Sequence, residues 1–236
     1  MRRTLIRRNI GHAFEGMPRY PQLSVMGGLR GLDYMGTCVF AVSGSVTAAT
    51  CGLDLLGATV VGCITALGGG TVRDVLWGRC PAFWLDETEY LYMSIVCAFG
   101  AFCFCYFDKP EGPVIDQILF WGDTIGLGAF AVIGTMYACR LKCSIVITLL
   151  CTMITCTGGG IIRDTLCRRP ARVLHAHAEV YAETAVFGGV VYLLTRALGV
   201  PLALRTVAGV LATVSARIWA STLDVRGPVA TPVIRN

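Results

Sequence analysis

Long apolar segments alternate along the chain with short polar ones, and seven of them are long enough to cross a bilayer. A helix that spans a hydrocarbon core of about 30 Å needs about 20 apolar residues. The segments lie at 25–51, 55–77, 88–107, 114–138, 144–167, 179–198 and 203–221. The pattern predicts an all-α membrane protein with seven transmembrane helices. Arg205 and Arg217 bracket the last one, and we expect their charged ends to extend toward opposite membrane surfaces.

The polar segments divide the chain into units. Residues 1–22 are rich in arginine and predict a polar tail, which serves either as a basic anchor at the membrane surface or as an organelle-targeting segment. We expect a first three-helix repeat at 23–110, a second at 111–199, the seventh helix at 200–222 and a C-terminal tail at 223–236. The protein is expected in a plasma or inner membrane, or in an organelle membrane.

Composition agrees with lipid as the solvent, since 55% of the 236 residues are hydrophobic and only 15% are charged. The net charge of +5 comes largely from the N-terminal tail, so no basic stripe predicts nucleic-acid binding. The twelve cysteines form no Cys-x-x-Cys pair and lie mostly in apolar segments, where cysteine packs as a small hydrophobe. We therefore expect no metal and no cofactor.

An enzyme is not expected either. The three histidines, His12, His175 and His177, lie outside the apolar segments, where they cannot form a buried catalytic dyad with serine or cysteine. A metal site at His175, His177 and Glu179 is an alternative, but this loop is rich in arginine and more typical of a basic surface.

The chain contains an internal duplication with a shift of 90 residues. Of the 47 positions from 33 to 79, 16 are identical in the segment from 123 to 169, without a gap. The best-matched part is Gly-Gly-Gly-x-x-Arg-Asp-x-Leu, at 68–76 and 158–166. Each unit holds three spans, so the second unit enters the membrane from the opposite side. The period therefore predicts inverted repeats, an architecture of membrane transporters.

The glycine triplets lie within the second and fifth predicted helices, at Gly68, Gly69 and Gly70 and at Gly158, Gly159 and Gly160. Glycine costs a helix about 1 kcal/mol relative to alanine, so we expect both helices to kink or open there. Backbone groups freed in this way cannot face lipid and would line a solute pathway. The alternative is that the glycines allow close helix packing.

Charged and hydroxyl residues accompany the triplets. Adjacent residues do not face each other on a helix, so we expect Arg73-Asp74 and Arg163-Asp164 to find partners across the repeat interface or in a wet layer. The alternative is that these arginines snorkel at helix ends. Thr65 and Thr155 offer hydroxyls to the pathway or bond their own helices.

Two aspartates, Asp33 and Asp123, lie inside the first helix of each unit. An intramembrane carboxylate is a functional candidate. It could hold a cation, exchange a proton, or pair with one of the motif arginines.

With its doubled Gly-Gly-Gly-x-x-Arg-Asp-x-Leu motif and seventh helix, the chain resembles, over about residues 25–222, the bacterial-type trimeric intracellular cation (TRIC) channel family. The repeat domain of this family is also labelled a glycine-transporter domain. The resemblance implies a homotrimer with one pore per subunit, bent at Gly68–Gly70 and Gly158–Gly160, with Arg73, Asp74, Arg163 and Asp164 beside the bends. It implies transport of monovalent cations such as K⁺, or of glycine.

Three functions follow from these features. The first is a cation channel in which carboxylates and carbonyls replace part of an ion's hydration shell. The second is an alternating-access carrier for glycine or a similar small amino acid. The third is a membrane scaffold that transports nothing and packs through small residues, as in Gly27-x-x-x-Gly31.

Overall fold

The computed structural model describes residues 20–108, 113–171 and 180–223. The described part is entirely helical, with eight helices that run in the order α2(Val25–Thr50), α3(Leu55–Leu76), α4(Phe83–Asp86), α5(Glu89–Asp108), α6(Pro113–Arg140), α7(Ile145–Leu166), α8(Ala182–Ala197) and α9(Leu202–Thr222). Most of the two expected tails and the histidines at 12, 175 and 177, with Glu179, lie outside the described residues.

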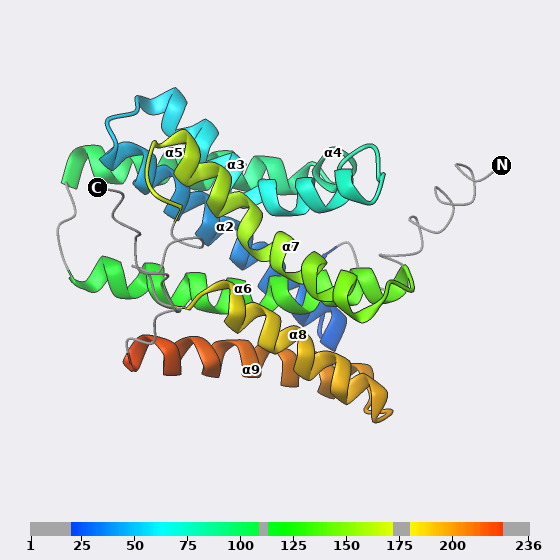
Figure 1. Cartoon of the computed structure of the whole chain (residues 1–236). Helices are drawn as coiled ribbons and strands as arrows, with labels where there is room; N and C mark the ends of the chain where they lie inside the picture. The colour runs from blue at the N-terminus through cyan, green and yellow to red at the C-terminus, as the bar shows by residue number, and fades with distance from the viewer. Residues whose placement is uncertain (1–19, 109–112, 172–179, 224–236) are drawn as a thin grey trace, which may run out of the picture.

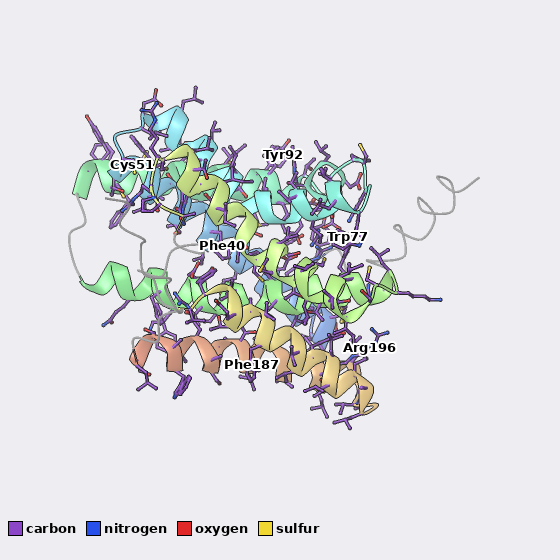
Figure 2. The ribbon with its side chains drawn as sticks, viewed as in Figure 1. Phe40, Cys51, Trp77, Tyr92, Phe187 and Arg196 are labelled. Atoms are coloured by element: carbon purple, nitrogen blue, oxygen red, sulfur yellow. The ribbon has the colours of Figure 1, made fainter. Side chains whose placement is uncertain are left out.

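Five helical segments in the described part are long and apolar enough to cross a membrane. They are Leu55–Leu76, Glu89–Phe107, Phe120–Arg140, Ile145–Leu166 and Leu202–Thr222. Two of the seven expected spans are not among them. The helix α8 has only 16 residues, and α2 carries Arg30 and Asp33 in its first half. Large apolar side chains such as Tyr92 and Phe187 are exposed on the outer surface, where a membrane protein contacts lipid (Figure 2).

The helices form two groups of three. The helices α2, α3 and α5 pack on one another, as do α6, α7 and α8. The groups meet where α3 contacts α7 and α2 contacts α6, and α9 packs against α6 and α8 (Figure 1). The core between the groups includes Phe40, which Figure 2 places inside the bundle.

Local sequence signals explain where the helices begin and end. The side chains of Ser24 and Asp54 cap α2 and α3 by accepting hydrogen bonds from Gly27 N–H and Gly57 N–H, at 3.0 and 2.7 Å. The turns after α2 and α3 contain Gly52 and Gly78 with positive φ, and those after α6 and α7 contain Lys142 and Arg168, each 90 residues further on. The two halves therefore use the same helix-ending turn with different residues.

The expectation that the two helices open at their glycine triplets is wrong. Each of α3 and α7 is a single α-helix of 22 residues that continues through its triplet. The propensity cost of three glycines is small compared with the packing of two long helices, so tertiary contact decides the conformation.

Candidate functional site

The glycine triplets lie where α3 crosses α7, and their contacts are reciprocal. A Cβ atom added to Gly68 would lie 3.1 Å from the Cα of Gly159, and one added to Gly158 would lie 3.1 Å from the Cα of Gly69. A Cβ on Gly69 would collide with the carbonyl oxygen of Thr155. These glycines let two backbones touch, as small residues do in membrane proteins.

The remaining glycines and the threonines of the motif have other surroundings. A Cβ on Gly70 would press on the ring of Phe83, at 2.5 Å, whereas Gly160 has open space around it. The hydroxyl groups of Thr65 and Thr155 each donate to a carbonyl of their own helix, that of Val61 and that of Cys151, both at 2.7 Å.

The motif arginines bind the aspartates that follow them. Arg73 Nε and Nη2 lie 3.0 and 2.9 Å from Asp74 Oδ1, and Arg163 Nε and Nη2 lie 2.8 and 2.7 Å from Asp164 Oδ1. The expectation that neighbours cannot pair is therefore wrong. A guanidinium sits at the end of a long flexible stem, so it can bend back to a carboxylate that its Cβ does not face.

These buried ion pairs also contact the other half of the molecule. Arg73 Cζ lies 4.6 Å from the ring centroid of Tyr137 on α6, and Arg163 Nη1 donates to Ser43 Oγ of α2 at 3.4 Å. The partners across the interface are thus an aromatic ring and a hydroxyl. Asp74 Oδ2 also accepts a hydrogen bond from Phe83 N–H at 2.9 Å, which anchors the start of α4.

Asp33 belongs to a buried polar cluster with three residues. The hydroxyl of Tyr90 on α5 donates to Asp33, and Arg30 Nη1 donates to that hydroxyl at 2.5 Å. Arg30 Nη1 also lies 3.7 Å from Asp33 Oδ2 and 2.8 Å from Glu87 Oε2. The arginine that pairs with Asp33 is therefore one turn away on its own helix and lies outside the glycine motif.

Asp123 has a similar tyrosine partner. Tyr181 Oη donates to Asp123 Oδ1 at 3.2 Å. Each repeat thus contains an aspartate on its first helix and a tyrosine at or just before the start of its third helix, joined by a hydrogen bond. The sequence analysis did not single out Tyr90 and Tyr181, because they are 91 residues apart and the duplication has a shift of 90 residues.

The Asp33 cluster lines a small pocket, with a cavity volume of about 40 Å³. Charged side chains from α2, α3 and the segment around α4 line it, namely Arg30, Asp33, Arg73, Arg79 and Glu87. On its inner side the pocket reaches Gly70 of α3 and Thr155 of α7, beside the glycine crossing. The pocket therefore places charged side chains beside the α3–α7 crossing. In the described part of the chain, His, Cys, Asp and Glu form no group of three suited to a metal ion.

Comparison with known proteins identifies the class. A solved structure of a TRIC cation channel is similar with a TM-score of 0.78 and 34% identity, covering 86% of this chain and 97% of that one. The trimeric intracellular cation channel orthologue from Rhodobacter sphaeroides gives 0.74 and 31%, with coverages of 84% and 99%. The chain is an integral, multi-pass membrane protein with the fold of these channels, and the resemblance supports a non-enzymatic membrane channel.

Relatives in sequence identify the family. The family model described as glycine transporter matches residues 30–108 and 120–197. A UPF0126 membrane protein of Vibrio cholerae is 35% identical over 80% of this chain and 77% of its own length. The UPF0126 inner membrane protein YadS of Escherichia coli K12 is 32% identical over 80% and 89%. The chain belongs to this glycine-transporter (TRIC) family.

Proposed function

We propose that the protein is a channel for monovalent cations such as K⁺, with a pathway between α2, α3, α6 and α7. The observation that carries the proposal is the pocket that begins at the buried Asp33 cluster and ends at the α3–α7 crossing. The similarity to solved cation channels supports it. Asp33 and Asp123 would replace part of the hydration shell of a cation at either end of this pathway.

The crossing is the expected gate. The Cβ contacts described above leave no room between α3 and α7 at Gly68, Gly69, Gly158 and Gly159, so conduction requires the helices to separate there. Separation would uncover the carbonyl oxygens of Thr65 and Thr155, which the glycines of the opposite helix now cover. Carbonyl oxygens are ligands for K⁺. In this form the glycine triplets line a pathway without any break in the helices.

We also propose that residues 23–110 and 111–199 are inverted three-helix repeats, with 200–222 as a seventh membrane helix between the second repeat and the C-terminal tail. Positions 90 residues apart make reciprocal contacts, which supports a twofold relationship between the units. The side chain of Trp77, after α3, donates to Cys143 Sγ in the α6–α7 turn at 3.4 Å. If the second repeat makes the equivalent contact, Cys167, which follows α7 and lies 90 residues after Trp77, would lie at the α2–α3 turn.

The assembly is expected to be a homotrimer. The Rhodobacter sphaeroides relative is described as trimeric, and it aligns over 99% of its length. Each subunit would hold its own pathway within the lipid bilayer.

A carrier for glycine is the second candidate, and the mixed charge of the pocket favours it. Arg30 and Arg73 could receive a carboxylate, and Asp33 or Glu87 an ammonium group. Purified protein in liposomes distinguishes the candidates. K⁺ flux that rises with concentration without saturating supports the channel, whereas saturable glycine uptake supports the carrier. If well-inserted protein shows neither K⁺ flux nor glycine uptake, that result supports the scaffold.

A further inference from the structure

The two aspartate–tyrosine pairs differ in the source of their arginine. In the first repeat Arg30 precedes Asp33 by one turn on α2 and donates to Tyr90. The equivalent position in the second repeat is Phe120, so α6 offers no arginine one turn before Asp123.

Arg217 of α9 lies at this place in the second repeat. Its Cζ is 4.8 Å from the ring centroid of Tyr181 and 5.4 Å from that of Phe120. In the first repeat, Arg30 Cζ is 5.6 Å from the ring centroid of Tyr90. Arg217 is 8% exposed and Arg30 3%, so both cations are buried. The Arg217 side chain is therefore covered by aromatic rings of the bundle rather than exposed on its outer face.

The burial of the Arg217 side chain bears on its role. A cation buried inside a membrane protein is costly and is retained where it has a partner or lines a polar pathway. The ring that Arg217 covers belongs to the tyrosine whose hydroxyl donates to Asp123. The guanidinium therefore constrains the ring of the tyrosine that binds Asp123.

We propose that Arg217 is a positioning residue of the second repeat, holding Tyr181 and through it Asp123 as Arg30 holds Tyr90 and Asp33. This makes α9 part of the conduction machinery rather than only a packing helix. The inference rests on the proposed channel function, because the repeats would place the two clusters at opposite ends of one pathway.

The decisive experiment moves the arginine from α9 to α6. Wild type, R217M and F120R/R217M are recorded in planar bilayers in symmetric K⁺ solution. We expect R217M to lower the K⁺ current about tenfold, which corresponds to about 1.4 kcal/mol. F120R/R217M restores the spacing of Arg30 and Asp33 and is expected to recover at least half of the wild-type current. R205M is the matched control, since Arg205 is also on α9 and lies over another ring, that of Tyr192, at 5.4 Å.

A second readout separates positioning from simple stabilisation. The two clusters would lie at opposite ends of the pathway, so R217M and R30M should skew the current–voltage curve in opposite directions. Wild-type current in R217M, or a folded F120R/R217M with current as low as R217M, would overturn the proposal. If R217M does not fold, the K⁺ currents of R217K and F120R/R217M are compared with that of wild type instead. An F120R/R217M variant that is inactive or unfolded counts against the proposal.

A failure of the proposed channel function would give a different result from a failure of the Arg217 proposal. Wild-type protein would then pass no K⁺ current, and no variant could be compared by flux. A thermal-stability cycle of R217M, Y181F and the double variant still measures the coupling of Arg217 to Tyr181. Coupling indistinguishable from zero in that cycle also contradicts the positioning role.

Discussion

Phe40 of α2 and Phe130 of α6 stack with ring centroids 5.3 Å apart, at an interplanar angle of 20°. The two residues are 90 positions apart, so each meets its own equivalent in the other repeat. Next to them, a Cβ on Gly36 would lie 3.1 Å from the Cα of Gly126, and the reverse contact is the same. Self-matching contacts of this kind are expected on a twofold axis.

The glycine crossing predicts a sharp difference between two neighbouring residues. In Gly159→Ala the new methyl group collides with the Thr65 carbonyl, and in Gly160→Ala it meets open space. Overpacking costs about 1–3 kcal/mol, so we expect Gly159→Ala to lower the melting temperature by roughly 3–10 °C. Gly160→Ala should melt at or slightly above the wild-type temperature, since alanine favours helices. Equal melting temperatures in detergent would refute the close crossing.

The buried pair of Arg73 and Asp74 predicts a large stability effect. Asp74→Asn leaves the guanidinium of Arg73 without its carboxylate in a site where Asp74 is 0% exposed. Breaking a buried pair typically costs about 3–5 kcal/mol. Asp86→Asn is the control, because its side chain is 51% exposed. Denaturation of both variants tests this, and comparable losses would show that burial does not matter at this pair.

The same pairing makes a prediction about charge reversal. Exchanging the charges of Arg73 and Asp164 is not expected to restore function, because each residue pairs with its own neighbour. Flux of the double reversal should stay as low as that of the single ones. Recovery to near wild type would indicate a direct contact between the two repeats at these charges.

Asp33 should affect transport more than folding. In Asp33→Asn, Arg30 keeps its ion pair with Glu87, so the cluster retains a buried contact while the pocket loses a negative charge. We expect K⁺ flux to fall about tenfold, equivalent to a barrier rise of about 1.4 kcal/mol. The matched control is Glu183→Gln, an exposed carboxylate at the start of α8, which should leave flux within a factor of two. Flux unchanged in Asp33→Asn would exclude this carboxylate from the pathway.

Inverted repeats predict the sides on which two equivalent turns lie. Cys51 and Lys142 are both exposed, after α2 and α6 respectively. Because Cys80 is also exposed, both proteins carry Cys80→Ser. A membrane-impermeant maleimide should then label Cys51 from one side of oriented vesicles. With Lys142→Cys in place of Cys51, it should label from the other side. Labelling of both from the same side would contradict the inversion.

The sequence predicted well what depends on local pattern. Hydropathy placed α3 and α7 within one or two residues of their bounds, and the 90-residue identity located the glycine crossing. Its errors concern long side chains and tertiary contacts. The Arg73–Asp74 pair depends on how far a guanidinium can bend, and the unbroken course of α3 through its glycines depends on its contact with α7. The role of Tyr181 and Arg217 depends on the packing of α9 against α6, which no spacing in one helix reveals.

Single-channel recording of purified wild-type protein in planar bilayers tests the channel most directly. With K⁺ as the permeant ion, we expect discrete openings whose current rises with K⁺ concentration and is carried by K⁺ rather than chloride, as the reversal potential in a salt gradient reports. The result that would contradict conduction through the α3–α7 crossing is the absence of K⁺ current in bilayers that contain folded protein, together with saturable glycine uptake by the same preparation in liposomes.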